Sequence, residues 1–228
     1  MSDFYSEKFM RNPFGKRAQE KIRKTTFAIV GLGGTGGFIL ENLLRMGAEN
    51  FILFDHDRFE LSNFNRQNLA TDEFIDHPKV HAAVSRAKSI NGGISIDTRH
   101  EFGPDSDISG AHILLDGVDN IGTKLQMAQL ARKTRIPYVF CSAQDSRGIV
   151  SVFTTYRFEK AFQVPQEEEA LSKYALCSSI ICPAASLSGT LAAQQAVNFL
   201  LKKPYIKAPD ALFFDLFRQE IFWRSELK

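Results

Sequence analysis

The sequence predicts an α/β fold: a Rossmann-like, mostly parallel sheet with helices on both faces, extended by antiparallel strands in its C-terminal half. Apolar runs rich in β-branched residues alternate with segments of helical periodicity up to Cys141, which is typical of parallel strands joined by helices. A glycine-rich turn joins the first apolar run to the first long helical segment. Near the C-terminus, two strand-like runs meet at Arg218-Gln219, which indicates an antiparallel hairpin.

The first half of the chain contains the expected parallel strands and the helices that connect them. Pro78 at a first turn and Gly92-Gly93 after a last turn mark one of these helices at both ends. The strands are expected at 26–30, 51–54, 94–98, 111–115 and 138–141, and the helices at 16–23, 38–46, 78–90 and 123–133.

The pattern changes in the second half. A strand at 148–154 is expected to leave the parallel register, and Pro183 opens a long helix that ends near Lys202. Between them, residues 156–175 are polar and weakly patterned, and a loop of this length is usually a functional cover or a disordered piece. The hairpin strands are expected at 211–217 and 220–224.

Composition indicates one sizeable core, because 44% of the 228 residues are hydrophobic. We expect an N-terminal arm and helix at 1–24 and a single domain at 25–228. The formal net charge of +2 gives no strong field toward nucleic acid or membrane. The charged N-terminus and the lack of a long apolar run predict a cytoplasmic protein with reduced thiols and no membrane partner.

The arm at 1–24 is both basic and aromatic. It holds seven Lys or Arg against three acids, which predicts either a solvated face or an anion-binding segment. Its aromatic side chains indicate that the arm packs against a surface. They are Phe4, Tyr5, Phe9 and Phe14.

The cysteines argue against a structural zinc site. The chain has three, Cys141, Cys177 and Cys182, and none forms a CxxC pair, whereas a tetrahedral Cys₄ site needs two such pairs. The five histidines are scattered over different elements. No bound zinc is therefore expected.

A nucleotide site is predicted where the first strand meets the glycine-rich turn. Glycines let the backbone approach a ligand closely, and the following helix offers N–H groups and the positive end of its dipole. Asp55 ends the second strand about 20 residues further on, where a carboxylate can bind a ribose hydroxyl. The alternative is that the glycines serve only turns and tight packing. They are Gly31, Gly33, Gly34 and Gly36.

Two cations favour ATP over a dinucleotide. A triphosphate carries more charge than a pyrophosphate and calls for added cations and Mg²⁺. Arg66 and Lys79 are suitable cations, and Asn63 and Gln67 are polar neighbours on the same segment. An NAD-dependent oxidoreductase, the alternative suggested by the bare glycine motif, would leave these cations without a shared task.

Asp119 follows the strand at 111–115, at the sheet edge that also carries Asp55. A carboxylate there is a natural Mg²⁺ ligand and leaves Asn120 to hydrogen-bond the nucleotide. Asp119 could equally cap the helix that follows, in which case Asp57 or Asp116 would be the next candidates for the metal.

Five motifs together resemble the ThiF/MoeB/HesA family, the adenylyltransferases of sulfur carriers and ubiquitin-like proteins. The resemblance runs from about Lys16 to Glu226. The motifs are Gly31-Leu32-Gly33-Gly34-Thr35-Gly36, Asp55-His56-Asp57, Ser62-Asn63-Phe64-Asn65-Arg66-Gln67, Pro78-Lys79-Val80 and Asp116-Gly117-Val118-Asp119-Asn120.

The resemblance implies that residues 25–228 form a ThiF-type ATP-binding adenylation domain and assigns roles to the matched residues. Gly34 and its neighbours would lie under the phosphates of ATP and Asp55 would bind the ribose. Asn63 and Arg66 would bind phosphates, Lys79 would neutralise the α-phosphate region, and Asp119 would bind Mg²⁺. Arg66, Lys79 and Asp119 would thus carry the catalysis.

The implied reaction is attack of the C-terminal glycine carboxylate of a small partner protein on the α-phosphorus of ATP, releasing pyrophosphate. The partner would be a ubiquitin-like or sulfur-carrier protein ending in Gly-Gly, and the enzyme would be a homodimer. A relative that activates a small molecule, a peptide or a modified tRNA base is the second possibility, and a catalytically silent binding module is another.

The chain departs from the family pattern in three places. It lacks the two CxxC pairs that bind zinc in many members. Glu7 stands where many members carry an arginine that reaches the partner subunit's ATP, so Arg11 or Lys8 would have to substitute. Some relatives transfer the acyl group to a cysteine before the long helix, and Cys177 is the candidate here, with Cys182 close by.

Overall fold

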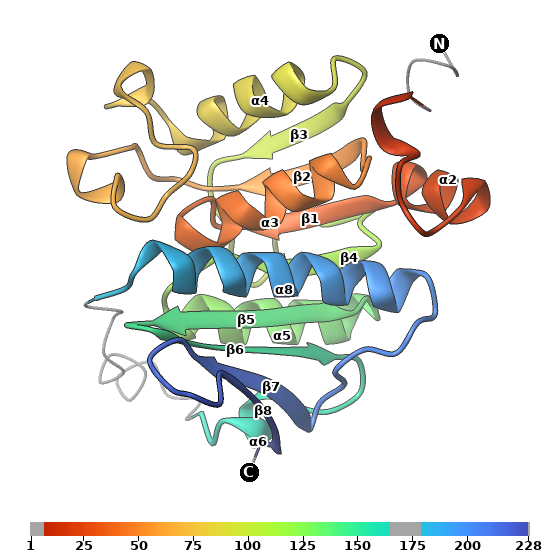
Figure 1. Cartoon of the computed structure of the whole chain (residues 1–228), viewed down its shortest axis with the longest axis vertical. Coiled ribbons are helices and arrows are strands. Elements are labelled where there is room, and N and C mark those ends of the chain that lie inside the picture. Colours follow the sequence, from red (N-terminus) through yellow and green to blue (C-terminus); the bar gives the residue numbers. More distant parts are fainter. Residues whose placement is uncertain (1–6, 165–178, 228) are drawn as a thin grey trace.

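Eight strands form one mixed sheet in the order β3-β2-β1-β4-β5-β6-β7-β8 (Figure 1). The structure is a computed structural model that describes residues 7–164 and 179–227. The strands are β1 (Thr26–Val30), β2 (Asn50–Phe54), β3 (Ser95–Arg99), β4 (Ile113–Asp116), β5 (Tyr138–Gln144), β6 (Arg147–Phe153), β7 (Asp210–Asp215) and β8 (Phe222–Glu226). The helices are α2 (Lys16–Lys24), α3 (Gly34–Arg45), α4 (Lys79–Ile90), α5 (Ile121–Thr134), α6 (Phe158–Ala161) and α8 (Cys182–Leu200), with 3₁₀ turns η1 (Leu61–Asn63) and η2 (Asp72–Phe74).

The first five strands are parallel and the last three extend the sheet antiparallel. β1 pairs with β2 on one side and with β4 on the other, so the strand order reverses between β1 and β4. β6, β7 and β8 each pair antiparallel with the preceding strand. The predicted fold class is confirmed, including the departure of 148–154 from the parallel register and the C-terminal hairpin.

Strand register brings the ends of the parallel strands together. Val30 lies opposite Phe54 of β2 and opposite Asp116 of β4. The residues that follow these positions therefore emerge side by side at one edge of the sheet, beside the point where the strand order reverses. Ligands of open α/β sheets bind at such a switch point.

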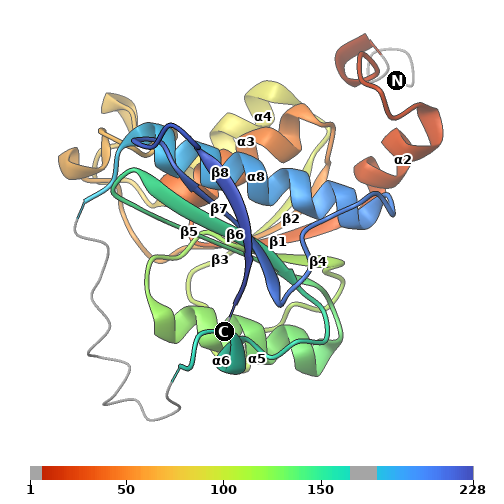
Figure 2. The same cartoon turned by 60° about the horizontal axis from the view of Figure 1, so that its bottom comes forward.

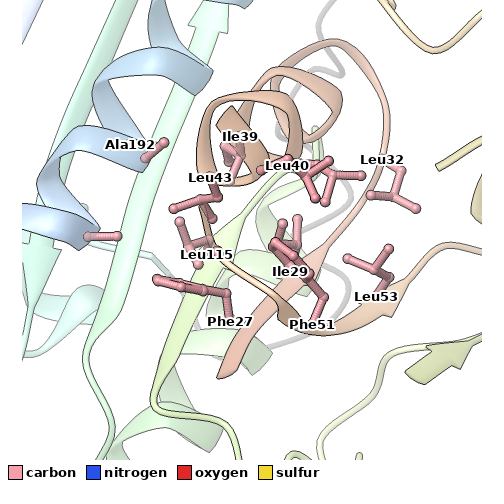
Figure 3. Close-up of a cluster of buried hydrophobic side chains, with 14 of the residues drawn as sticks. Phe27, Ile29, Leu32, Ile39, Leu40, Leu43, Phe51, Leu53, Leu115 and Ala192 are labelled. Carbon is pink, nitrogen blue, oxygen red and sulfur yellow. The ribbon is translucent and has the colours of Figure 1, made fainter. Parts of the chain in front are cut away.

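Both faces of the sheet are covered, because alternate side chains of a strand point to opposite faces. Phe27 and Ile29 of β1 belong to a core cluster that also contains side chains of α3 and α8 (Figure 3). Ala28 and Val30 belong to a second cluster under α5 and α6. Figure 2 shows α3, α4 and α8 on one side of the sheet and α5 and α6 on the other.

The described part of the arm packs on the chain's own core. Phe9 is buried in the first cluster, and Phe14 packs against it. Lys8 donates a hydrogen bond to the Ile90 carbonyl (3.0 Å) and Lys21 to the Leu200 carbonyl (2.5 Å). These carbonyls end α4 and α8, where a cation complements the helix dipole. Part of the arm's basic and aromatic character is thus explained within one chain.

The expectation of a loop at 156–175 is wrong for part of the described residues. Residues 158–161 form the short helix α6, and Phe158 is buried in the second cluster. Its ring lies 5.4 Å from that of Phe140 and 4.7 Å from that of Phe162. Aromatic burial outweighs the polar character of the neighbouring residues. The remainder of the segment from residue 165 lies outside the described residues.

Within the described ranges, no helix is long and apolar enough to cross a membrane. The division between residues 1–24 and 25–228 stays a prediction, although Ile22 of α2 is fully buried in the first core cluster.

Candidate functional site

A cavity of about 390 Å³ lies where the carboxyl ends of β1, β2, β3 and β4 meet. Its walls also include the start of α4, the end of β5 and the segment 65–67. Most of the residues predicted for the nucleotide site line this one cavity. They are Gly31, Gly33, Gly34, Asp55, Arg66, Gln67, Lys79, Asp119 and Asn120.

The glycines divide into two groups. Gly36 is buried and does not line the cavity; a Cβ there would lie 1.8 Å from the Gly31 carbonyl oxygen. Gly31 has a positive φ of 82° and packs against Gly117. A Cβ at Gly33 would meet only the Gln67 side chain, at 3.6 Å. Tight packing therefore accounts for Gly36 and in part for Gly31, whereas Gly33 and Gly34 are exposed to the cavity.

Asp55 connects the glycine turn to the end of β2. One carboxylate oxygen accepts a hydrogen bond from the Leu32 N–H (2.6 Å) and the other accepts one from the Asp57 N–H (2.8 Å). Burial raises the pKa of Asp55, and the Lys79 charge partly offsets that effect. A carboxylate has about four acceptor positions, so capacity remains for a ligand hydroxyl.

Lys79 is a buried cation at the cavity wall. Its ammonium lies 2.8 Å from the Asp57 carboxylate, and its backbone N–H donates to the Asp57 carbonyl (2.9 Å). Burial acts to raise the pKa of Asp57, but the hydrogen bond and charge of Lys79 outweigh it and hold that pKa below the ordinary value. The pair fixes the start of α4 against the loop after β2.

Arg66 faces the cavity from the segment after η1. Its guanidinium donates to the Ser62 carbonyl (2.9 Å) and the Asn65 side chain (2.8 Å). None of the carboxylates in the described ranges pairs with it. Asn63 is buried in a capping box with Glu60 and does not line the cavity. Its backbone carbonyl accepts hydrogen bonds from the Arg66 and Gln67 N–H groups (3.2 and 2.9 Å) and so holds the segment 65–67 in place.

Asp119 and Asn120 have different environments. Asn120 is the N-cap of α5, and its side chain accepts the Thr123 N–H at 2.8 Å. The helix-cap alternative therefore applies to Asn120 and not to Asp119. Asp119 is exposed at the cavity. Asp116, the fallback metal ligand, is fully buried and paired with Lys124 (2.9 Å), which removes it from the cavity.

Neither of the two described cysteines lines the cavity. Cys177 lies outside the described residues. Cys182 is exposed and begins α8. Cys141 is buried, and burial together with the nearby Asp116 charge raises the pKa of its thiol to about 12, which agrees with an inert thiol. In the described part of the chain, no group of three or more His, Cys, Asp or Glu could hold a metal ion.

Several lining residues were not predicted. The segment after β3 could have been found by the rule that led to Asp55 and Asp119, because β3 ends at the same edge. Residues from β5 and from the region before α8 carry no local signal. The lining residues that lie outside the predicted strands and motifs are His100, Glu101, Phe102, Thr123, Ser142, Ala143, Ser179 and Ile180.

The protein is an α/β protein with a glycine turn at the switch point of its sheet, an arrangement typical of nucleotide-binding folds. The chain belongs to the ThiF family, whose model matches residues 5–228.

Characterised relatives resemble most of the chain. The molybdopterin-synthase adenylyltransferase of Escherichia coli (strain K12) is 27% identical over 203 residues, which cover 86% of this chain and 81% of the relative. That of Haemophilus influenzae is 30% identical over 195 residues, with coverage of 81% and 78%. The sulfur carrier protein ThiS adenylyltransferase of Bacillus subtilis (strain 168) is 31% identical over 156 residues, 65% of this chain and 46% of that protein.

Solved structures share the fold. E. coli MccB with MccA-N7isoASN gives a TM-score of 0.76 at 17% identity, covering 92% of this chain and 66% of that one. MccB with ATP gives 0.72 at 16%, covering 92% and 65%. This chain thus spans just under two thirds of MccB. E. coli tRNA N6-threonylcarbamoyladenosine dehydratase, TcdA, with AMP gives 0.73 at 20%, covering 88% and 96%.

Proposed function

We propose that the protein is an ATP-dependent adenylyltransferase acting on the C-terminal glycine carboxylate of a small ubiquitin-like or sulfur-carrier protein. The observation that carries this proposal is the single cavity that joins Gly33, Arg66, Lys79 and Asp119. Family membership and the adenylyltransferase relatives support ATP as the nucleotide. The carrier-protein substrate is proposed from the names of those relatives.

The phosphates of ATP would lie between the start of α3 and the segment after η1. The glycine turn presents backbone N–H groups at the helix N-terminus, which favours anions. Arg66 offers a guanidinium that no carboxylate of the described chain neutralises. Lys79 is already paired with Asp57. Its ammonium would therefore neutralise phosphate charge only where the phosphate displaces the Asp57 carboxylate or shares the ammonium with it. Gln67 lines the same wall.

The ribose would bind at Asp55 and the base beyond it. Asp55 lies at the end of β2 with acceptor capacity left after its two backbone hydrogen bonds. Asn120 uses its side-chain oxygen as the α5 cap, so only its amide N–H groups could donate to the nucleotide. Asn63 would act through the segment it supports.

Mg²⁺ fits the donor set at this cavity. Mg²⁺ is usually held by one or two carboxylates together with waters and substrate phosphates rather than by a full protein cage. Asp119 is an exposed carboxylate at the cavity, and the described residues supply no larger cluster. When bound, the ion would neutralise charge on the phosphates. Asp119 would hold it and orient it.

The reaction needs no protein nucleophile. A carboxylate oxygen of the partner would form a bond to the α-phosphorus while the bond from that phosphorus to the bridging oxygen breaks, and pyrophosphate leaves with the electron pair. Positioning and charge neutralisation by Arg66, Lys79 and Asp119 would provide the acceleration. A later transfer of the acyl group to Cys177 is the family-derived extension of this proposal.

A homodimer is part of the proposal, on grounds of geometry. The described part of the arm and α2 lie at the end of the sheet where β1 begins (Figure 1), and the cavity lies at the opposite end, where the parallel strands finish. A basic residue of the arm therefore cannot reach the cavity of its own chain, but could reach that of a second copy. Lys8 is engaged at the end of α4, which makes Arg11 the better candidate. Twofold dimers are the commonest closed assemblies.

ATP–pyrophosphate exchange tests the function. We expect exchange that requires Mg²⁺ and a Gly-Gly-ending carrier protein. Exchange that responds instead to a peptide, a small carboxylic acid or a tRNA would assign the chain to the second class of substrate. ATP binding without exchange for any of these would favour a silent binding module. Tight NADH binding without ATP binding would support the oxidoreductase reading, although none of the relatives described above is an oxidoreductase.

A further inference from the structure

A buried ion pair lies directly beneath the floor of the cavity. Lys124 and Asp116 have side chains that are only 5% and 0% exposed and lie 2.9 Å apart. Neither residue lines the cavity, but Gly117, Val118, Asp119 and Thr123, their chain neighbours, do. Removing two charges from water is costly, so a pair at this place calls for a reason beyond helix packing.

Lys124 connects three separate parts of the cavity wall. It belongs to the first turn of α5 and reaches back to the end of β4 through Asp116. Its ammonium also donates to the Cys141 carbonyl of β5 at 3.0 Å, one residue before the lining residue Ser142. The ammonium also lies 5.3 Å from the centre of the Phe140 ring, which is a favourable contact for a cation.

Asp116 in turn fixes the loop that carries Asp119. The carboxylate oxygen that pairs with Lys124 also accepts the Val118 N–H at 3.1 Å. The other oxygen accepts the Tyr138 hydroxyl at 2.5 Å, and the Asp116 carbonyl accepts the Cys141 thiol at 3.0 Å. The Gly117 N–H donates to the Val30 carbonyl at 2.7 Å. The loop 117–120 is thus held at consecutive residues, while Asp119 itself projects into the cavity.

The charge of Asp116 depends on Lys124: burial raises the pKa of Asp116, and the positive charge of Lys124 acts against that effect. Tyr138 and Cys141, the other titratable groups facing Asp116, are both buried, and burial raises the pKa of each above its ordinary value. Both are therefore neutral near neutral pH, and Lys124 supplies the one positive charge in contact with the Asp116 carboxylate among the described residues.

We propose that Lys124 is a positioning residue for the metal and phosphate site: by holding Asp116 and the Cys141 carbonyl together, it fixes the loop that presents Asp119. This inference rests on the proposed function. It assigns Lys124 no contact with ATP or the metal. Removing a group that orients a metal ligand without touching the metal typically lowers metal affinity or activity by about 10–100-fold.

The test compares Lys124→Met with Arg132→Met. Both substitutions remove a cation of α5 that pairs with a carboxylate. Arg132 lies about 12 Å further along α5 than Lys124, and its partner is Glu159 (2.9 Å). We expect Lys124→Met to raise the Mg²⁺ concentration for half-maximal exchange and to lower kcat, each by about tenfold or more. In Arg132→Met both should stay near wild type. A purely structural role would lower stability without moving the Mg²⁺ dependence.

Two additions keep the test decisive. If Lys124→Met does not fold, the double variant Asp116→Asn/Lys124→Met removes the unpaired buried charge and is measured in its place. Wild-type Mg²⁺ dependence in either variant overturns the proposal.

Hydrogen exchange of the Gly117 and Val118 amides is a measurement that does not depend on enzyme activity. We expect faster exchange there in Lys124→Met than in Arg132→Met, and equal rates contradict the proposal. An inactive wild type would refute the proposed function alone.

Discussion

At the residue scale, Asp119 and Asn120 show how two adjacent polar side chains acquire different tasks. Asn120 accepts the Thr123 N–H as the cap of α5, whereas Asp119 is exposed at the cavity. Because capping is already provided, the carboxylate of Asp119 makes little contribution to helix stability. Helix capping therefore does not account for the carboxylate at this position.

Asp119→Asn should therefore separate metal binding from stability. We expect the variant to melt near wild type, since exposed substitutions usually change the free energy of unfolding by less than about 0.5 kcal/mol. Adenylation should fall by about 10²–10³ and recover partly at high Mg²⁺. The stability control is Asn120→Ala, which should lose about 1 kcal/mol with the cap. Exchange within about threefold of wild type in Asp119→Asn would exclude the metal role.

Cys141 provides a second residue-scale prediction. Its thiol is buried and its pKa is raised to about 12, and the thiolate is the reactive form. In the native protein at neutral pH, we expect Cys141 to resist alkylation while the exposed Cys182 is modified. Since the pKa is raised in the folded state, this cysteine should also weaken the fold as pH rises from the ordinary thiol value toward 12. Mass spectrometry of alkylated peptides checks the first point, and rapid labelling of native Cys141 would contradict it.

At the element scale, the glycine turn has two roles within one motif. Gly36 lets α3 approach the Gly31 backbone, and no side chain fits there. Gly33 leaves room for a side chain and opens to the cavity. One part of the motif thus serves packing, and another part lines the cavity.

This division predicts opposite phenotypes for two similar substitutions. Gly36→Ala would place Cβ 1.8 Å from the Gly31 carbonyl, so we expect a loss of stability of several kcal/mol, on the order of severe core defects. Gly33→Ala should melt near wild type but bind ATP more weakly, because its methyl group occupies the space where the phosphates are proposed to lie. Thermal melts and nucleotide titrations check both; equal stabilities of the two variants would refute this assignment.

The elements themselves were largely predictable. The strand at 26–30 has the predicted bounds, and the other strands shift by one to three residues at their ends. The helix expected at 38–46 begins four residues earlier, at Gly34. The exception is α6, where Phe158 and Phe162 pack on strands that are distant in sequence. A segment as short as 158–161 carries too little periodicity to reveal such a contact.

At the scale of the whole molecule, the described part of the arm and α2 lie at the end of the sheet where β1 begins (Figure 1), whereas the cavity lies at the opposite end, where the parallel strands finish. A contribution of the arm to catalysis therefore requires a second chain. The described aromatic residues Phe9 and Phe14 cover the chain's own core, so they no longer argue for a partner surface. The case for the dimer rests on the geometry of the basic residues.

Complementation between two variants tests this arrangement. Arg11→Ala would lack the basic residue supplied in trans, and Asp119→Asn would lack the metal ligand. We expect each alone to be weakly active, but co-expressed chains with different tags should recover up to about a quarter of wild-type exchange, because mixed twofold dimers contain one complete site. Full activity of Arg11→Ala, or a mass of 25.6 kDa in light scattering, would contradict the proposal.

The amino-acid sequence by itself determined the order of strands and helices and the sheet edge at which Gly33, Asp55 and Asp119 meet. It could do so because periodicity is local and because parallel strands joined by helices place their carboxyl ends together. Only the tertiary structure decided which contacts each of the residues at this edge makes. That Asn120 caps α5, that Gly36 packs against Gly31, and that Lys124 pairs with Asp116 and reaches Cys141 depend on distances and directions in three dimensions, which residue spacing does not encode.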